Sequence, residues 1–143
     1  MNNYVKAEFL SDSRNEALAR NIVSAFLLQL NPTLEELADV RTAVSEAVTN
    51  AIVHAYKNTI GQVNLSCTLN EEVLEITVED FGCGIKNVDE AMEPFFTTGD
   101  NDERTGMGFA VMQAFMDEVN VVSNPGKGTR VLLKKYIMLR EVH

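Results

Sequence analysis

The sequence predicts an α/β chain of the α+β type, in which helices pack on one face of a mixed, largely antiparallel sheet. Segments in which apolar and polar residues alternate occur near both ends of the chain and in its middle, and a period of two is typical of half-buried strands. Between them lie longer segments with apolar residues three or four positions apart, which indicate amphipathic helices. The predicted order is strand, helix, helix, hairpin, long loop, helix and hairpin.

The composition is that of one globular domain, residues 1–143, and it argues against several kinds of partner. Hydrophobic residues make up 45% and charged residues 23% of the chain, which are ordinary values. The formal net charge of -9 argues against direct binding to nucleic acid or to an anionic membrane. No apolar run approaches the roughly 20 residues of a membrane span, and no signal-peptide pattern is present, so we expect a cytoplasmic protein. Cys67 and Cys83 are too few to indicate a disulfide framework or a zinc site.

The first two predicted elements are a strand over residues 4–9 and a helix over 13–29. Apolar and polar residues alternate in the strand, whereas the helix has apolar residues at four-residue spacing. Ser13 and Glu16 have the Ser-x-x-Glu form of a capping box, which marks a helix N-terminus. Glu16 and Arg20 lie four positions apart on the outer face of this helix, as in an ordinary exposed ion pair.

A second, longer helix is predicted from Thr33 to about residue 57, and it carries the most informative polar residues. The Thr-Leu-Glu-Glu sequence at its start repeats the capping-box pattern after an Asn-Pro break. Glu46, Asn50 and His54 recur every fourth position, so they form one polar stripe beside an apolar face. On its own, such a stripe is more typical of a solvated helix face than of a ligand site.

The rest of the chain is predicted to contain two hairpins, with a long loop and a short helix between them. Each hairpin joins two alternating segments through a turn of polar residues or glycine. The loop over 86–105 lacks a strong period and has the length of a lid or binding segment. The helix covers 109–116. The hairpin strands cover 63–69, 74–78, 119–123 and 129–136.

An Asp-x-Gly-x-Gly box of Asp80, Gly82 and Gly84 follows the strand 74–78. Glycines at this spacing let the backbone approach a flat ligand. A carboxylate at the end of a strand can accept a hydrogen bond from the exocyclic amine of adenine, where guanine has a carbonyl. Asp80 is therefore a candidate adenine-selecting residue, although Asp-Gly turns are common in any protein.

A second glycine pair, Gly106 and Gly108, precedes the predicted helix 109–116. Free amides at a helix N-terminus bind phosphate, so this pair is a candidate phosphate site. It is not a Walker motif, and the Gly-Lys-Gly-Thr run at 126–129 lies between two strands rather than before a helix. The sequence also lacks a dinucleotide fingerprint after its first strand and the His-Arg-Asp loop of protein kinases.

In this order, the polar stripe, the two glycine boxes and the Gly-x-Gly-Thr run at 126–129 resemble the motifs of the GHKL ATPase/kinase superfamily. That superfamily includes gyrase, a heat-shock chaperone ATPase, sensor histidine kinases and mismatch-repair ATPases. The match covers nearly the whole chain. The compact form, with the uninterrupted run from Glu46 to Tyr56, is similar to the bacterial anti-sigma serine kinases. This resemblance implies a Bergerat-type two-layer sandwich with an ATP lid over about 86–108.

The resemblance also implies a role for each motif residue. Glu46 would be the general base that takes the proton of the attacking hydroxyl, and Asn50 would bind Mg²⁺ and through it the phosphates. Asp80 would read adenine, Thr129 would complete the adenine end, and Arg104 is a candidate contact to the γ-phosphate. The set implied for the nucleotide is Asn50, Asp80, Gly82, Gly84, Ile85, Thr98, Gly99, Arg104, Thr105, Gly106, Met107, Gly108 and Thr129.

The activity implied by the resemblance is that of an ATP-dependent protein serine kinase that is also an anti-sigma factor. It would use ATP/ADP and Mg²⁺, form a homodimer, sequester a sporulation sigma factor of the sigma-F type and phosphorylate a serine of the anti-anti-sigma protein, thereby controlling transcription. One alternative is a nucleotide-binding anti-sigma module without kinase activity, against which Glu46 argues. Another is a histidine-kinase-type catalytic domain, although the sequence offers no helix pair with a phosphoacceptor histidine. A gyrase- or mismatch-repair-type ATPase would need a longer chain.

Overall fold

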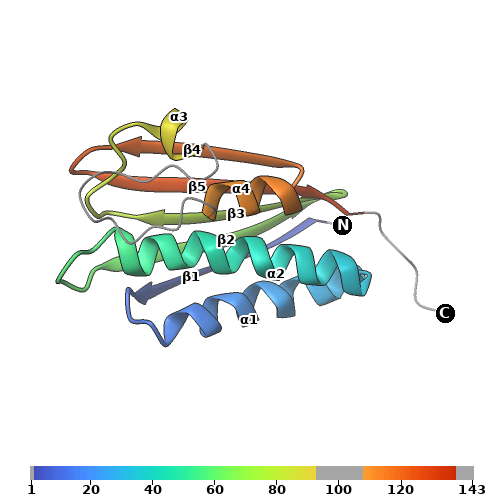
Figure 1. Ribbon diagram of the computed structural model, residues 1–143. Helices are drawn as coiled ribbons and strands as arrows, with labels where there is room; N and C mark the ends of the chain where they lie inside the picture. The colour runs from blue at the N-terminus through green and yellow to red at the C-terminus, as the bar shows by residue number, and fades with distance from the viewer. Residues whose placement is uncertain (1, 93–107, 138–143) are drawn as a thin grey trace.

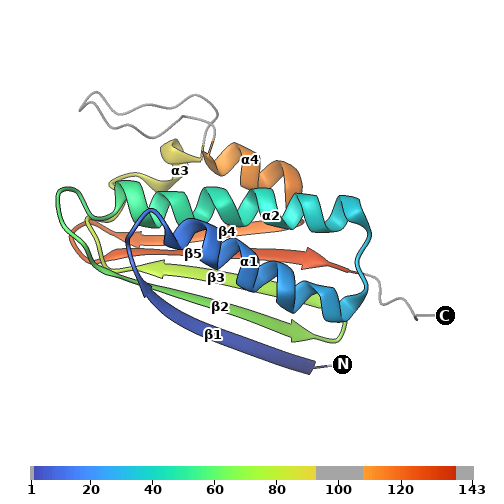
Figure 2. The same cartoon turned by 90° about the horizontal axis from the view of Figure 1, so that it is seen from below.

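Helices and strands form two layers in the computed structural model, which describes residues 2–92 and 108–137 (Figure 1). The strands are β1 (Asn2–Leu10), β2 (Gln62–Asn70), β3 (Val73–Asp80), β4 (Glu118–Asn124) and β5 (Gly128–Tyr136). The helices are α1 (Asn15–Leu27), η1 (Leu28–Leu30), α2 (Leu34–Thr49), η2 (Asn50–His54), α3 (Val88–Ala91) and α4 (Gly108–Phe115). Helices α1, α2 and α4 cover one face of the sheet, and Figure 2 separates the two layers. The predicted fold class, with its helices on one face, is confirmed.

The described strands form one sheet in the order β1-β2-β3-β5-β4, and every adjacent pair in it is antiparallel. The expectation of a mixed sheet was therefore wrong in this respect. The helices α1 and α2 run antiparallel to each other between β1 and β2. The chain therefore enters β2 at the end of the sheet where β1 ends, and β2 runs antiparallel to β1. The connection from β3 through α4 makes β4 parallel to β3, but β5 lies between these two strands. No parallel neighbours result among the described strands.

The hydrophobic core lies between the two layers. Strands β2 and β3 alternate between buried and more exposed residues, as their sequences predict, and α1 and α2 contribute their inner faces. Fully buried core residues include Val23, Leu27, Val40, Val44, Val48, Cys67, Leu74 and Ile76. Burial raises the pKa of the Cys67 thiol to about 12, so this cysteine serves as an inert core side chain. Within the described part of the chain, no helix combines the length and apolar character needed to cross a membrane.

The N-terminus of α1 differs from its predicted capping box. The residue before the helix is Arg14, and its side chain makes no capping hydrogen bond. The turn is closed instead by Asp12, whose carbonyl accepts from the Asn15 amide at 2.9 Å and whose side chain accepts from the Arg14 amide, also at 2.9 Å. Glu16 does not reach back to Ser13, because its carboxylate accepts a hydrogen bond from Ser45 of α2. The Ser13–Glu16 capping box was therefore a wrong prediction.

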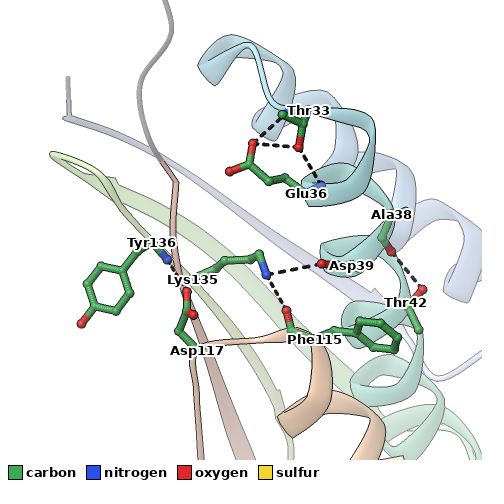
Figure 3. Close-up of polar contacts among 9 residues, drawn as sticks. All are labelled: Thr33, Glu36, Ala38, Asp39, Thr42, Phe115, Asp117, Lys135 and Tyr136. Carbon is green, nitrogen blue, oxygen red and sulfur yellow. Dashed lines mark hydrogen bonds and ion pairs between the residues drawn. The ribbon is translucent and has the colours of Figure 1, made fainter.

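The N-terminus of α2 has the capping box that its sequence predicts (Figure 3). Thr33 Oγ1 accepts from the Glu36 amide at 3.0 Å, and Glu36 Oε1 accepts from the Thr33 amide at 2.9 Å. Asp39 follows in the second turn of this helix, and its Oδ2 lies 3.7 Å from Nζ of Lys135 in β5. The same ammonium group donates to the carbonyl oxygen of Phe115 at 2.6 Å. Lys135 thus joins three elements, because Phe115 is the last residue of α4.

Candidate active site

A pocket lies between the C-terminal end of α2 and the sheet, and it gathers residues from separate sequence motifs. Its polar lining includes Asn50, Asp80 and Thr129, and Gly84 and Ile85 also line it. The apolar lining consists of Ala47, Ala51, Ala55, Val78, Phe109 and Val131. A mostly apolar pocket with a few convergent polar groups has the character of a small-molecule site.

Glu46 and Asn50 face the first residue of α4. A Cβ added to Gly108 would lie 3.4 Å from Glu46 Oε2 and 3.7 and 3.8 Å from Nδ2 and Oδ1 of Asn50. The first residue of an eight-residue helix therefore lies beside a carboxylate and a carboxamide. Both of these side chains are half-buried, and burial raises the pKa of Glu46 above its usual value. The helix terminus adds a partial positive charge to this end of the pocket.

The helix that carries these residues changes form at Asn50. Residues 50–54 make a π turn, in which the Ala55 amide donates to the Asn50 carbonyl at 3.1 Å. The sequence predicted one regular helix to about residue 57, so this prediction was wrong beyond Thr49. The His54 side chain is buried. Such π turns occur frequently at functional sites.

Asp80 lies at the end of β3, and it is only 6% exposed. Its Oδ1 accepts a hydrogen bond from the Gly82 amide at 3.0 Å. Gly82 must be glycine, because an added Cβ would lie 2.2 Å from the carbonyl oxygen of Ala55. Gly84 has φ +74, and its Cβ would lie 2.3 Å from the carbonyl oxygen of Asn124. The glycines of the Asp-x-Gly-x-Gly box thus allow the loop to pack closely against two other segments.

Thr129 lies directly opposite Asp80 in the sheet register. Its hydroxyl is 2.8 Å from the hydroxyl of Ser123, which in turn accepts from the Ile85 amide at 2.7 Å. Ser123 was not singled out from the sequence, although it pairs with Thr129 across the β4–β5 hairpin. A register worked out for that hairpin would have identified it. Ser123 therefore joins Thr129 to the loop that follows Asp80.

Several predicted site residues, and most of the predicted lid, lie outside the described residues. These are Thr98, Gly99, Arg104, Thr105, Gly106 and Met107, and their roles stay predictions. Within 2–92 and 108–137, no group of three or more His, Cys, Asp or Glu side chains could hold a metal ion. The polar groups at Asn50 and Glu46 fit Mg²⁺ better than a transition metal, because Mg²⁺ is commonly bound by one or two protein oxygens together with phosphates and water.

The fold and the site define a histidine kinase-like ATPase domain, and the family model of that description matches residues 9–135. The RsbU and RsbW domains of Rv1364c from Mycobacterium tuberculosis have a similar structure, with a TM-score of 0.69 at 17% identity over 94% of this chain and 32% of that one. Full-length ShkA in complex with AMPPNP gives a TM-score of 0.60 at 18% identity, over 89% of this chain and 31% of ShkA. At these identities, the two likenesses show the fold alone.

Curated relatives identify the branch of the family. An anti-sigma F factor from Caldanaerobacter subterraneus subsp. tengcongensis is 54% identical over 136 residues, which cover 95% of each chain. The anti-sigma F factor of Clostridium kluyveri is 52% identical over 133 residues, covering 93% of this chain and 94% of the relative. The chain belongs to the anti-sigma F factors, within the histidine kinase-like ATPase family. It therefore combines an anti-sigma function with a kinase-type ATPase domain.

Proposed function

We propose that this protein is an ATP-dependent protein serine kinase that also sequesters a sporulation sigma factor of the sigma-F type. Its phosphoryl acceptor is a serine of the anti-anti-sigma protein, and the working form is a homodimer. One observation carries the kinase assignment: Gly108, at the N-terminus of α4, lies against both Glu46 and Asn50. This closeness supports a phosphate-binding role for the helix terminus, with Glu46 as the base and Asn50 as the metal ligand. The names of the relatives support the sigma-factor partner.

Asp80 selects the adenine base in this proposal. Its carboxylate is buried at the pocket wall, where it accepts a hydrogen bond from the adenine amine. Thr129, held by Ser123, completes the same end, and the backbone of Gly82, Gly84 and Ile85 approaches the ring. A site built to hydrogen-bond one group discriminates strongly against a ligand in which that group is reversed, so ATP is preferred over GTP.

Asn50 would hold Mg²⁺ through its side-chain oxygen. Bound Mg²⁺ supplies charge neutralisation for the phosphates. The amides at the start of α4 bind phosphate oxygens from the other side. Phosphoryl transfer needs mainly positioning and electrostatic stabilisation, and these groups supply both. Arg104, in the predicted lid, stays a candidate contact to the γ-phosphate.

Glu46 is the general base. It takes the proton of the incoming serine hydroxyl while the serine oxygen bonds to the γ-phosphorus. The bond from that phosphorus to the β–γ bridging oxygen then breaks, and ADP leaves. Burial raises the pKa of Glu46, which strengthens it as a base. A purely binding anti-sigma module would have no use for a carboxylate at this position.

The test uses purified protein with Mg²⁺, γ-labelled ATP, a sigma-F-type factor and its anti-anti-sigma protein. We expect acid-stable label on one serine of the anti-anti-sigma protein. Asn50→Ala should abolish the Mg²⁺-dependent part of ATP affinity, and Asp80→Asn should reduce the preference for ATP over GTP. Sigma binding without any transfer would instead establish a nucleotide-binding module. Acid-labile label on a histidine would establish a histidine-kinase-type domain.

A further inference from the structure

Tyr56 lies two residues beyond the π turn, and its hydroxyl bridges the start of β2 and the residue that follows β3. It donates to the carbonyl of Gln62, at the start of β2, at 2.6 Å. It also accepts from the amide of Phe81, the residue after Asp80, at 2.7 Å. One phenolic hydroxyl therefore uses both its donor and an acceptor position to hold the backbone beside Asp80.

The residue before it, Ala55, holds the other side of the same loop. The Ala55 carbonyl accepts from the Cys83 amide at 2.9 Å, and the Ala55 amide donates to Asn50. Together, Ala55 and Tyr56 fix the backbone of 81–83 on both sides of Gly82. The same short segment therefore connects Asn50, at the phosphate end of the pocket, to the loop that follows Asp80.

The ring of Tyr56 packs closely against Gly61. A Cβ added to Gly61 would lie 2.2 to 2.6 Å from three carbon atoms of the ring, so the ring occupies the space that any other residue at 61 would fill. The pKa of Tyr56 is raised, first by burial and further by the negative charge of Asp80, against the opposing effect of the hydrogen bond from Phe81. The phenol stays neutral at physiological pH, and its hydroxyl can donate to Gln62.

We propose that Tyr56 is a positioning residue for nucleotide selection: its hydroxyl fixes the Phe81 backbone and thereby aims the Asp80 carboxylate at the base. The inference rests on the proposed adenine-binding role of Asp80. Tyr56 acts through the backbone, so its effect falls on recognition of the base, while phosphate binding and the transfer step are unaffected.

Tyr56→Phe tests this directly, because it removes the hydroxyl and keeps the ring that fills the space at Gly61. Calorimetry should show about tenfold weaker affinity for ATP, since the Phe81 amide loses its acceptor. Affinity for inorganic tripolyphosphate should be unchanged, and the ratio of ATP to GTP affinity should fall by about the same factor. In transfer assays, KM for ATP should rise while kcat at saturating ATP is unchanged. The matched control is Tyr136→Phe, at an exposed phenol on β5, and it should change none of these values.

Gly61→Ala provides a second route to the same effect, because it displaces the Tyr56 ring without removing the hydroxyl. It should also lower the preference for ATP over GTP. Hydrogen exchange should show faster exchange of the Phe81 amide in both variants. The inference is overturned if Tyr56→Phe binds ATP as tightly and as selectively as the original protein. It is also overturned if tripolyphosphate affinity falls in parallel with ATP affinity. A protein that shows no preference for ATP even with Tyr56 intact would overturn the adenine assignment of Asp80 itself.

Discussion

The two ends of the α2–η2 helix both carry polar side chains, but they use them differently. At the N-terminal end (Figure 3), Thr33 and Glu36 satisfy each other's backbone amides, and Asp39 pairs with Lys135. The side chains at this end therefore have hydrogen-bond and ion-pair partners within the protein itself. At the C-terminal end, Glu46 and Asn50 lie beside Gly108 of α4, Asn50 lines the pocket, and the backbone leaves the regular α-helical form after Thr49. The comparison shows that regular helix geometry accompanies the stabilising contacts, whereas the departure from it coincides with the candidate site.

The largest expected effect separates function from stability at the C-terminal end. Glu46→Gln should reduce phosphoryl transfer by about 10²–10⁴-fold, because it removes the general base. Affinities for ATP and the sigma factor should be retained. The measurement is transfer and binding, made side by side. Near-normal transfer would show that Glu46 is not the base, and loss of sigma binding would show that it serves the structure.

The same variant, Glu46→Gln, should lose activity without losing thermal stability. Burial raises the pKa of Glu46 in the folded protein, so the folded state holds this proton more tightly than the unfolded state. The resulting stabilisation is complete below the unfolded pKa and is lost as the pH rises through the folded pKa. At neutral pH, Glu46→Gln should therefore melt at the same temperature as the original protein or higher. Transfer by the original protein should fall as the pH drops through the raised pKa, because the base becomes protonated.

At the N-terminal end, the largest loss of stability is expected from Lys135→Met. The change keeps the length of the side chain but leaves the Phe115 carbonyl and the Asp39 carboxylate without the ammonium. We expect a loss of about 1–3 kcal/mol in the free energy of unfolding, measured with urea, and no change in ATP affinity. Lys134→Met is the matched control, because its partners Glu75 and Glu118 are 41% and 50% exposed. Exposed ion pairs contribute little to stability, so Lys134→Met should leave the free energy of unfolding nearly unchanged. Equal losses in the two variants would contradict the role given to Lys135.

The smallest effect compares the two helix starts. Thr33→Ala should lower the free energy of unfolding by about 1 kcal/mol, because it removes the hydroxyl oxygen that accepts a hydrogen bond from the Glu36 amide. Ser13→Ala should have almost no effect, because no side-chain cap forms at the start of α1. Thermal melting of the two variants under the same conditions is the measurement. A loss for Ser13→Ala as large as that for Thr33→Ala would show that the α1 cap forms in solution.

These two helix starts also show what the sequence could predict. Both have the capping-box pattern, but only Thr33 forms the box. At α1, the competing partner of Glu16 is Ser45, 29 positions away, and local pattern carries no information about such a contact. The strands were predicted well, because burial of one sheet face imposes alternation on the sequence itself.

The candidate site was predictable where it depends on motif residues and unpredictable where it depends on packing. Asn50, Asp80 and Thr129 line one pocket, as their motifs led us to expect. The π turn was missed, because one extra residue in a helical turn changes the hydrogen bonding without changing the apolar pattern. Tyr56 and Ser123 were missed, since their hydroxyls act on backbone groups that only the folded chain brings near.

The two cysteines differ in exposure, so the protein can be labelled selectively at one of them. Cys83 lies within the Asp-x-Gly-x-Gly box and is exposed, whereas Cys67 is buried, with a thiol pKa of about 12. Only the thiolate reacts with alkylating reagents, so a maleimide dye at neutral pH should attach to Cys83 and leave Cys67 unmodified. The dye would lie three residues from Asp80, where its emission could follow nucleotide exchange in the unmutated chain.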